Sequence, residues 1–265
     1  CVSNETTVTP AWGQYWADFI RQKSAKVGRT VYVTEMWNAW DMRDRQHRET
    51  FDHPEHYDFV DLSQNTHNSG QQHADGVLWV RSHLAARPRP MNAVKIYGSE
   101  QRGHSGNEAL ERFWRNIFCG MAASRFHRPD SGLGGSEQAL QQVVAVRRLL
   151  ERFNLFGAQP ASALLGDRRP DEAHALHAEG AMAIYFPPPE PPAWWEQPLV
   201  QADLLDVAQR SVTLGGGVLS GAARRIAWLS PGRPAPLIWQ ELPAGSIEVA
   251  PPDAGHWIAL VEAQP

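Results

Sequence analysis

Polar residues that could do chemistry follow five short apolar runs of this sequence. Carboxylates, amides, imidazoles and ammonium groups are the side chains that transfer protons or bind hydroxyl-rich molecules. The groups are Asn4 and Glu5; Glu35, Trp37 and Asp41; Gln64, Asn65 and His67; Lys95, Tyr97 and Glu100; and Arg125, His127 and Arg128. Because each run ends in such a group, we expect one site that is assembled from several chain segments.

The elements that must position these residues alternate between strands and helices. β-Branched and aromatic residues predict strands that end at Ser3 and that run over 30–37, 57–65, 92–98 and 123–129. Helical spacing of apolar residues predicts helices over 10–27, 70–86, 107–122 and 136–153. Trp12, Trp16 and Trp114 fall on apolar stripes of these helices, so we expect them in the core.

This alternation is typical of a parallel sheet, either closed into a barrel or doubly wound. In a (β/α)8 barrel every strand end contributes to the site, whereas a doubly wound sheet concentrates the site at one switch point. No glycine-rich phosphate-binding motif follows a predicted strand. For residues 1–156 we therefore predict the α/β class, as part of a TIM-type (β/α)8 barrel.

Proline usage predicts a second domain. Five of the twenty prolines precede Ala158 and fifteen follow it. Short alternating runs over 180–187, 211–219, 224–231 and 255–263, separated by Gly- and Pro-rich turns, indicate a small antiparallel β-sandwich over residues 157–265. Trp228 and Trp257 are predicted core residues, and Trp194 and Trp195 are predicted to dock against the barrel.

Charge and cysteine content argue against several classes of protein. The formal net charge of −4 gives no electrostatic reason to expect nucleic acid as a partner. No stretch approaches the roughly 18 apolar residues of a membrane span. The two cysteines define no disulfide framework, and the histidines lack the spacing of a zinc site. We expect no metal and no cofactor.

The pair Asn4-Glu5 resembles the acid/base motif of the clan A glycoside hydrolases, which carry it at the end of the fourth strand of a (β/α)8 barrel. The ordered stretches that follow resemble glycosidases related to the apiosidase-like enzymes, in which a β domain named for collagen binding follows the barrel. They are "TEMWNAWD", "DLSQNTHNSGQQH", "NAVKIYG" and "ERFWRNIFCGMAASRFHRPDSG". The resemblance implies that residues 1–156 are the C-terminal half of the barrel. The alternative is a complete, open five-stranded sheet.

Two carboxyl groups are needed to hydrolyse a glycosidic bond. The resemblance implies that Glu5 is the acid/base. Its nucleophile would follow the seventh strand, where this chain has Lys95 and then Glu100. Glu35 is the other candidate for the partner, and Glu35 and Glu100 both stay open. Either one could instead be an ion-pair partner of a nearby cation.

The predicted function is hydrolysis of a polysaccharide or oligosaccharide. Trp37 and Trp40 are expected to stack on sugar rings. The full set of predicted substrate-binding residues is Asn4, Trp37, Trp40, Asn65, His67, Lys95, Tyr97, Arg125, His127 and Arg128. The alternatives are a non-catalytic carbohydrate-binding protein on a degenerate barrel and an adhesion module that acts through the sandwich. The resemblance favours a secreted or periplasmic location, and the sequence leaves the oligomeric state open.

Overall fold

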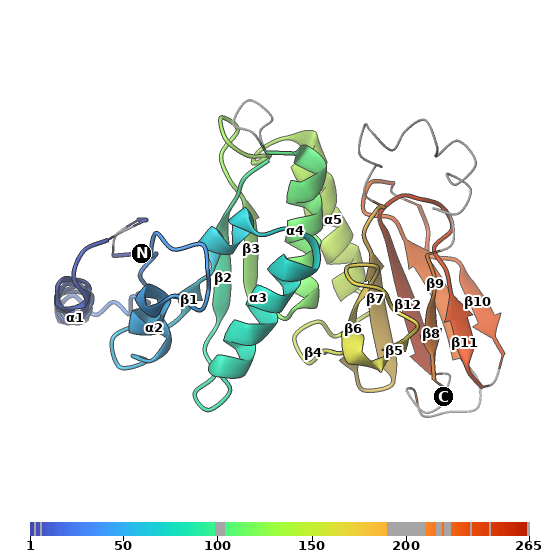
Figure 1. The fold of residues 1–265 in the computed structure, drawn as a ribbon, viewed down its shortest axis with the longest axis horizontal. Coiled ribbons are helices and arrows are strands. Elements are labelled where there is room, and N and C mark those ends of the chain that lie inside the picture. Colours follow the sequence, from blue (N-terminus) through green and yellow to red (C-terminus); the bar gives the residue numbers. More distant parts are fainter. Residues whose placement is uncertain are drawn as a thin grey trace. The chain divides into compact units, whose positions relative to one another are not determined.

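The computed structural model describes residues 1–2, 4–5, 7–98, 104–189, 210–215, 219, 224–233, 235–243 and 245–263. Glu100, Trp194 and Trp195, which the sequence analysis singled out, lie outside the described residues. The chain forms two compact units, residues 1–135 and 136–265 (Figure 1). Each unit is described by itself.

The first unit is built around a parallel sheet with the strand order β1-β2-β3. The strands are β1 (Val60–Asp61), β2 (Met91–Ile96) and β3 (Ala123–Phe126). The helices are α1 (Pro10–Lys26), α2 (Arg45–Phe51), α3 (Gly70–His83), α4 (Gly106–Phe118) and the short 3₁₀ helix η1 (Ser63–His67). Helices therefore separate consecutive strands, as the sequence predicts.

Two further segments continue the sheet beyond β1. The carbonyl of Val33 accepts a hydrogen bond from the amide of Asp58 at 2.8 Å, and the carbonyl of Thr34 accepts one from the amide of Val2 at 2.8 Å. The segment over 31–36 is not a regular strand, in contrast to the strand predicted over 30–37. It nevertheless lies beside both Val2 and Asp58. The five predicted strand positions thus follow one another across the unit in sequence order.

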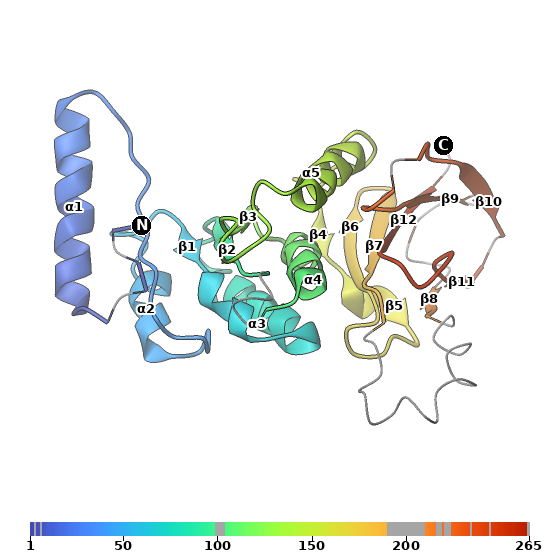
Figure 2. The same ribbon diagram turned by 90° about the horizontal axis from the view of Figure 1, so that it is seen from above.

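Helix α1 contacts the rest of the first unit through its small residues. Gly13 and Ala17 are buried, and Ala17 packs against Val33 and Tyr57. Trp12 and Trp16 are 41% and 36% exposed, so the prediction that they lie in the core is wrong. Their rings pack against each other, with centroids 6.1 Å apart, on a helix at the edge of the unit (Figure 2).

Helix α4 is buried over most of its surface. Ser105 caps its N-terminus by accepting a hydrogen bond from the amide of Glu108 at 3.4 Å. Trp114 is completely buried, which confirms its predicted place in the core. Phe113 stacks on Phe126 of β3 with ring centroids 4.8 Å apart. This contact fixes the strand that leads into His127.

The second unit contains two antiparallel sheets and one long helix, α5 (Glu137–Leu150). One sheet has the order β10-β9-β12-β7-β6-β4 and the other the order β11-β8-β5. The strands are β4 (Gln159–Pro160), β5 (Leu165–Gly166), β6 (His174–Ala178), β7 (Ala181–Phe186), β8 (Val212–Leu214), β9 (Arg224–Leu229), β10 (Trp239–Leu242), β11 (Ile247–Val249) and β12 (Trp257–Ala263). A 3₁₀ helix, η3 (Ser162–Leu164), precedes β5.

The two sheets of the second unit share one hydrophobic core. Leu214 of β8 and Ile247 of β11 pack in the same cluster as Ile184 of β7 and Val261 of β12. Trp228 is partly buried against this cluster. Helix α5 groups with these sheets, whereas the sequence analysis assigned that segment to the first domain. The boundary between residues 156 and 157 stays a prediction.

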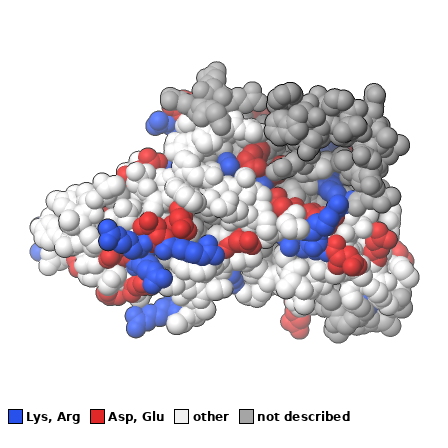
Figure 3. Space-filling model, viewed as in Figure 1, with Lys and Arg blue, Asp and Glu red and all other residues white. Residues whose placement is uncertain are grey.

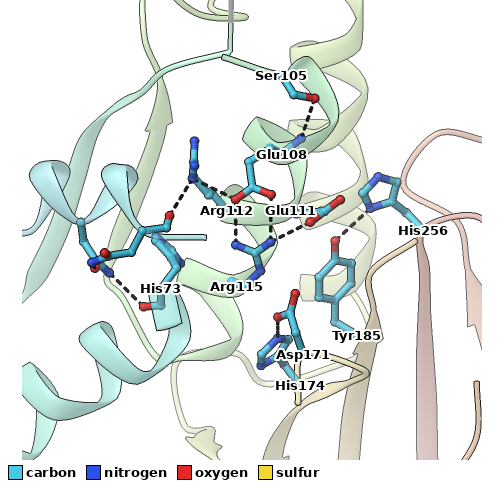
Figure 4. Close-up of polar contacts among 12 residues, drawn as sticks. His73, Ser105, Glu108, Glu111, Arg112, Arg115, Asp171, His174, Tyr185 and His256 are labelled. Carbon is cyan, nitrogen blue, oxygen red and sulfur yellow. Dashed lines mark hydrogen bonds and ion pairs between the residues drawn. The ribbon is translucent and has the colours of Figure 1, made fainter. Parts of the chain in front are cut away.

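A short series of polar side chains crosses the large sheet of the second unit (Figure 4). Nε2 of His174 lies 2.7 Å from the carboxylate of Asp171, and the hydroxyl of Tyr185 lies 2.9 Å from Nδ1 of His256. The rings of His174 and Tyr185 are stacked. Buried polar side chains need hydrogen-bond partners, so we interpret these two contacts as structural.

Charged side chains of both signs are interspersed on the face drawn in Figure 3. None of the helices in the described part of the chain is long and apolar enough to cross a membrane.

Candidate active site

A polar pocket of about 460 Å³ lies in the first unit, where the predicted strand ends meet. It brings together predicted site residues from three of the five groups. Its lining consists of Asn4, Glu5, Lys95, Tyr97, His104, His127, Arg128 and Ser131. Asn4 and Glu5 come from the start of the chain, Lys95 and Tyr97 from the end of β2, and His127 and Arg128 from the segment after β3.

Glu5 is the only carboxylate in the lining of this pocket, within the part of the chain that the structure describes. Its Oε1 lies 2.6 Å from Nζ of Lys95 and accepts a 3.2 Å hydrogen bond from the hydroxyl of Tyr97. The hydrogen bond and charge of Lys95 lower the pKa of Glu5, with smaller contributions from Tyr97 and Gln64, although partial burial opposes them. Glu5 is therefore ionised at neutral pH in this state.

The backbone of Glu5 has a φ of +53°, in the left-handed region that non-glycine residues rarely adopt. Strained backbone of this kind persists only where surrounding contacts hold it, and such residues cluster at functional sites. The bonds from Lys95 and Tyr97 provide contacts of this kind. The conformation is thus consistent with a role of Glu5 in the pocket.

Tyr97 and two histidines form an aromatic wall of the pocket. The Tyr97 ring stacks on His104 with centroids 5.1 Å apart and meets the edge of His127 at 5.2 Å. Burial, and then the charge of Glu5, raises the pKa of Tyr97 to about 12, so its hydroxyl remains a hydrogen-bond donor. Rings that stack with a polar tip suit the apolar faces and hydroxyls of a sugar.

Both histidines of this wall are neutral at neutral pH. Burial, followed by the nearby charges of Lys95 and Arg128, lowers the pKa of His127. Burial, followed by the charge of Arg112, lowers the pKa of His104. Nδ1 of His127 is buried and has no hydrogen-bond partner among the described residues. A neutral imidazole can both donate and accept, which matches a hydroxyl ligand.

Tight turns hold His127 against the end of β2. The hydrogen-bond register of β2 and β3 shifts between Ala93 and Ile96, the stretch that contains Lys95. A β-carbon at Gly134 would lie 2.4 Å from the carbonyl oxygen of His127, so only glycine fits there. The amide of Gly134 donates to that same oxygen at 2.6 Å.

Glu35 does not line the pocket. It is 1% exposed, and its Oε2 points toward α1, where a β-carbon on Gly13 would lie 3.2 Å from it and 2.8 Å from the hydroxyl of Tyr57. Burial and the charge of Glu35 raise the pKa of Tyr57. Glu35 thus faces the same side of the sheet as Val33, which packs on α1. The second catalytic carboxylate stays a prediction, and Glu100 lies outside the described residues.

The two tryptophans predicted to stack on sugar do not line the pocket either. Trp37 is 2% exposed, and its indole nitrogen donates a 2.6 Å hydrogen bond to Thr50 Oγ1. It is a core residue. Trp40 is 55% exposed. The aromatic surface that the pocket does present comes from Tyr97, His104 and His127.

Exchange of Trp37 for phenylalanine should lower the free energy of unfolding by about 2 kcal/mol, because it removes a buried hydrogen bond and leaves a cavity. Trp40→Ala should change stability by less than about 0.5 kcal/mol, since Trp40 is exposed. Urea unfolding of both variants measures this difference. Weaker oligosaccharide binding by Trp37→Phe at unchanged stability would contradict the placement of Trp37 in the core.

The remaining predicted substrate-binding residues, Asn65, His67 and Arg125, do not line the pocket. Asn65 is fully buried; it donates to the carbonyl of His73 at 2.9 Å and accepts from Asn68 at 2.8 Å, so it ties η1 to α3. His67 and Arg125 are exposed. Their charges help to lower the pKa values of His104 and His127 respectively, which places them within electrostatic range of the pocket.

Sequence reasoning missed His104 and Ser131, which complete the lining. Both lie in loops with no periodic signal, so only the folded contacts bring them to Tyr97 and His127. Among the residues that the structure describes, no group of three or more His, Cys, Asp and Glu side chains is placed to hold a metal ion.

No family model and no curated protein matches this sequence. Solved structures do resemble it. A glycoside hydrolase family 5 protein from Bacteroides vulgatus ATCC 8482 is 12% identical, with a TM-score of 0.57 over 80% of this chain and 52% of that one. A family 30 endoxylanase from Clostridium papyrosolvens C71 is 11% identical, with a TM-score of 0.54 over 99% of this chain and 64% of that one. An Anoxybacillus α-amylase is 10% identical, with a TM-score of 0.52 over 97% of this chain and 57% of that one.

The chain spans about half to two thirds of the length of these structures. Identities this low establish the fold alone. The chain has a mixed α/β fold of the kind found in glycoside hydrolases.

Proposed function

We propose that this chain is part of a glycoside hydrolase that cleaves a polysaccharide or oligosaccharide with two carboxyl groups, one of which is Glu5. The observation that carries the proposal is the pocket in which Glu5, Lys95 and Tyr97 meet, although they come from the first and the fourth of the five segments. The likeness to glycoside hydrolases supports it through the fold. The substrate is a carbohydrate whose hydroxyls bind the neutral histidines and Tyr97.

The proposed role of Glu5 is that of the acid/base. To protonate the leaving oxygen it must carry a proton, and its pairing with Lys95 works against this in the resting state. We propose Glu100 as its partner. A separation of about 5–5.5 Å between the two carboxyl groups would give retention of configuration, and about 6.5–9.5 Å would give inversion.

We further propose that the first unit is the C-terminal half of a (β/α)8 barrel and that the second unit is a β-sandwich. Five segments of the first unit follow one another in sequence order, with helices between them, and β1, β2 and β3 are parallel. The exposed aromatic residues of α1 suit a helix that packs against a further βα unit. The two sheets of the second unit with their shared core support the sandwich.

The experiment that tests the function is a substrate screen with the full-length protein. Plant and microbial polysaccharides and their oligosaccharides are incubated with it, and new reducing ends are counted. We expect turnover of at least one of them. Binding of an oligosaccharide without turnover would favour the alternative of a non-catalytic carbohydrate-binding protein, for which the pairing of Glu5 with Lys95 is the supporting observation.

Expression of residues 1–265 alone tests the half-barrel proposal. Open sheet edges and the exposed face formed by Trp12, Tyr15 and Trp16 favour aggregation, so we expect this piece to be poorly soluble or inactive. A monodisperse monomer of these residues that melts cooperatively would contradict the proposal.

Because polysaccharides do not cross membranes, a secreted or periplasmic location goes with this function, and fractionation of the source cells tests it.

A further inference from the structure

Asp61 is a buried carboxyl group that the proposed mechanism has not yet used. It is 3% exposed and lies at the end of β1. Its neighbours Val60 and Leu62 pack in the hydrophobic cluster that contains Val77 of α3. Successive side chains of a strand point to opposite faces, so Asp61 points to the sheet face away from α3.

One oxygen of Asp61 is bonded and the other is not. Oδ1 accepts a 2.8 Å hydrogen bond from the amide of Ser63. Oδ2 is buried and has no hydrogen-bond partner among the described residues. A buried carboxylate oxygen without a partner is costly, whereas a protonated carboxyl group is not charged. The geometry therefore favours the protonated form of Asp61.

Short contacts connect Asp61 to the pocket. The amide of Ser63 donates to Asp61. The Oγ of Ser63 accepts a 2.9 Å hydrogen bond from the amide of Val94, the residue before Lys95. The next residue, Gln64, makes a side-chain hydrogen bond to Glu5. Asp61 and Glu5 are thus attached to the same short 3₁₀ turn, and Lys95 acts on both.

The environments of Asp61 and Glu5 shift the pKa values of the two carboxyl groups in opposite directions. Burial raises the pKa of Asp61, and the hydrogen bonds of Ser63, followed by the charge of Lys95, oppose this without reversing it. The pKa of Glu5 is lowered, chiefly by its bond to Lys95. In the resting state Glu5 is ionised, and burial favours the protonated form of Asp61. Environments that separate the pKa values of two carboxyl groups in this way give the two groups different roles.

We propose that Asp61 is a positioning residue that keeps one proton within the Glu5–Lys95–Asp61 cluster. This rests on the proposed function of Glu5. Before the leaving group departs, Glu5 takes up one proton from water and Asp61 releases one proton to water. Lys95 stays charged and exchanges Glu5 for Asp61 as its counter-ion, so the cluster keeps its total charge. The exchange provides the protonated Glu5 that departure of the leaving group requires.

This arrangement has a distinct pH dependence. Well below the pKa of Asp61 this carboxyl group is neutral, as an amide would be, and the protonated fraction of Glu5 falls tenfold for each pH unit with either group. As Asp61 ionises, its negative charge raises the proton affinity of Glu5, so the protonated fraction of Glu5 levels off near the pKa of Asp61. Without Asp61 the protonated fraction of Glu5 falls tenfold for each pH unit above the lowered pKa of Glu5. The difference appears only with substrates that need protonation of the leaving group.

The experiment compares Asp61→Asn with the full-length parent. Asparagine can keep the hydrogen bond from Ser63. For natural glycosides we expect kcat/KM of the parent and of Asp61→Asn to fall together well below the pKa of Asp61. Near that pKa the parent should level off, whereas Asp61→Asn should continue to fall about tenfold per pH unit. Aryl glycosides with good leaving groups should show similar profiles for both proteins. Asp75→Asn, an exposed carboxyl on α3, is the matched control and should follow the parent.

A parallel pH profile for Asp61→Asn and the parent would overturn the proposal. Carbon-13 carboxyl resonances of the parent provide a readout that does not depend on activity or on the folding of the variant. We expect Asp61 to titrate above its ordinary range and Glu5 to report the same step. An ordinary pKa for Asp61 would overturn the proposal, whereas coupled titration without any glycoside turnover would contradict the proposed function instead.

Discussion

Replacement of Glu5 by glutamine should lower turnover of natural glycosides by about 10²–10⁴-fold in the full-length protein, the usual contribution of general acid/base assistance. Glutamine keeps the shape of the side chain and can still accept a hydrogen bond from Lys95 or Tyr97, so the pocket should remain intact. It removes the group that takes up and releases the proton. Initial rates with an oligosaccharide substrate measure the effect.

A comparison of substrates with good and poor leaving groups distinguishes this loss of turnover from a general disturbance of the pocket. Aryl glycosides with good leaving groups need little protonation, so the bond-breaking step of Glu5→Gln should suffer much less with them. Natural turnover within a few-fold of the parent would show that Glu5 is a solvated loop carboxylate paired with Lys95.

Two further glutamate variants identify the partner. Glu100→Gln should abolish turnover of both substrate types if Glu100 is the nucleophile or base. Glu35→Gln should change mainly the stability, because Glu35 faces α1 and Tyr57 instead of the pocket. Loss of turnover of both substrate types in Glu35→Gln, at unchanged melting temperature, would reverse this assignment.

The sequence predicted three of the segments that line the pocket, because strand ends carry a local signal. The polar groups after the predicted strands led directly to Glu5, Lys95, Tyr97 and His127, which do line one pocket. The order of the segments followed from the alternation of strand and helix patterns. Parallel neighbours joined by helices leave few other arrangements.

The direction of each side chain was harder to predict. The alternation of side chains along a strand does not say which face of the sheet is covered by a helix. That choice is settled by the small residues Gly13 and Ala17, which let α1 approach that face. Glu35 is consequently buried on the side of the sheet that α1 covers. Trp37 is buried beside Thr50 of α2.

Asp61 was overlooked for a related reason. In the sequence it reads as one polar residue inside an apolar strand, next to Val60 and Leu62, and nothing local distinguishes it from a solvated position. Its burial and its link through Ser63 to Lys95 arise only when η1 folds back along β2. Long-range electrostatics of this kind have no signature in residue spacing.

Exchange of Arg115 for methionine should lower the free energy of unfolding by about 3–5 kcal/mol, the usual cost of removing one member of a buried ion pair. Arg115 is fully buried in α4, and its guanidinium lies 2.6 Å from Glu111 and 3.3 Å from Glu108 (Figure 4). Methionine fills much of the volume but provides no positive charge for the two carboxylates. Chemical unfolding at neutral pH measures the loss.

A second substitution tests the cause of this loss. In Arg115→Met/Glu111→Gln the buried charge of Glu111 is removed together with that of Arg115, so the double variant should be more stable than Arg115→Met alone. Because Phe113 of the same helix stacks on Phe126 below the pocket, Arg115→Met should also weaken oligosaccharide binding in the full-length protein. A loss of less than about 1 kcal/mol in the free energy of unfolding of Arg115→Met would contradict this prediction. It would show that other groups stabilise the carboxylates of α4 and that these ion pairs do not determine the position of α4 against β3.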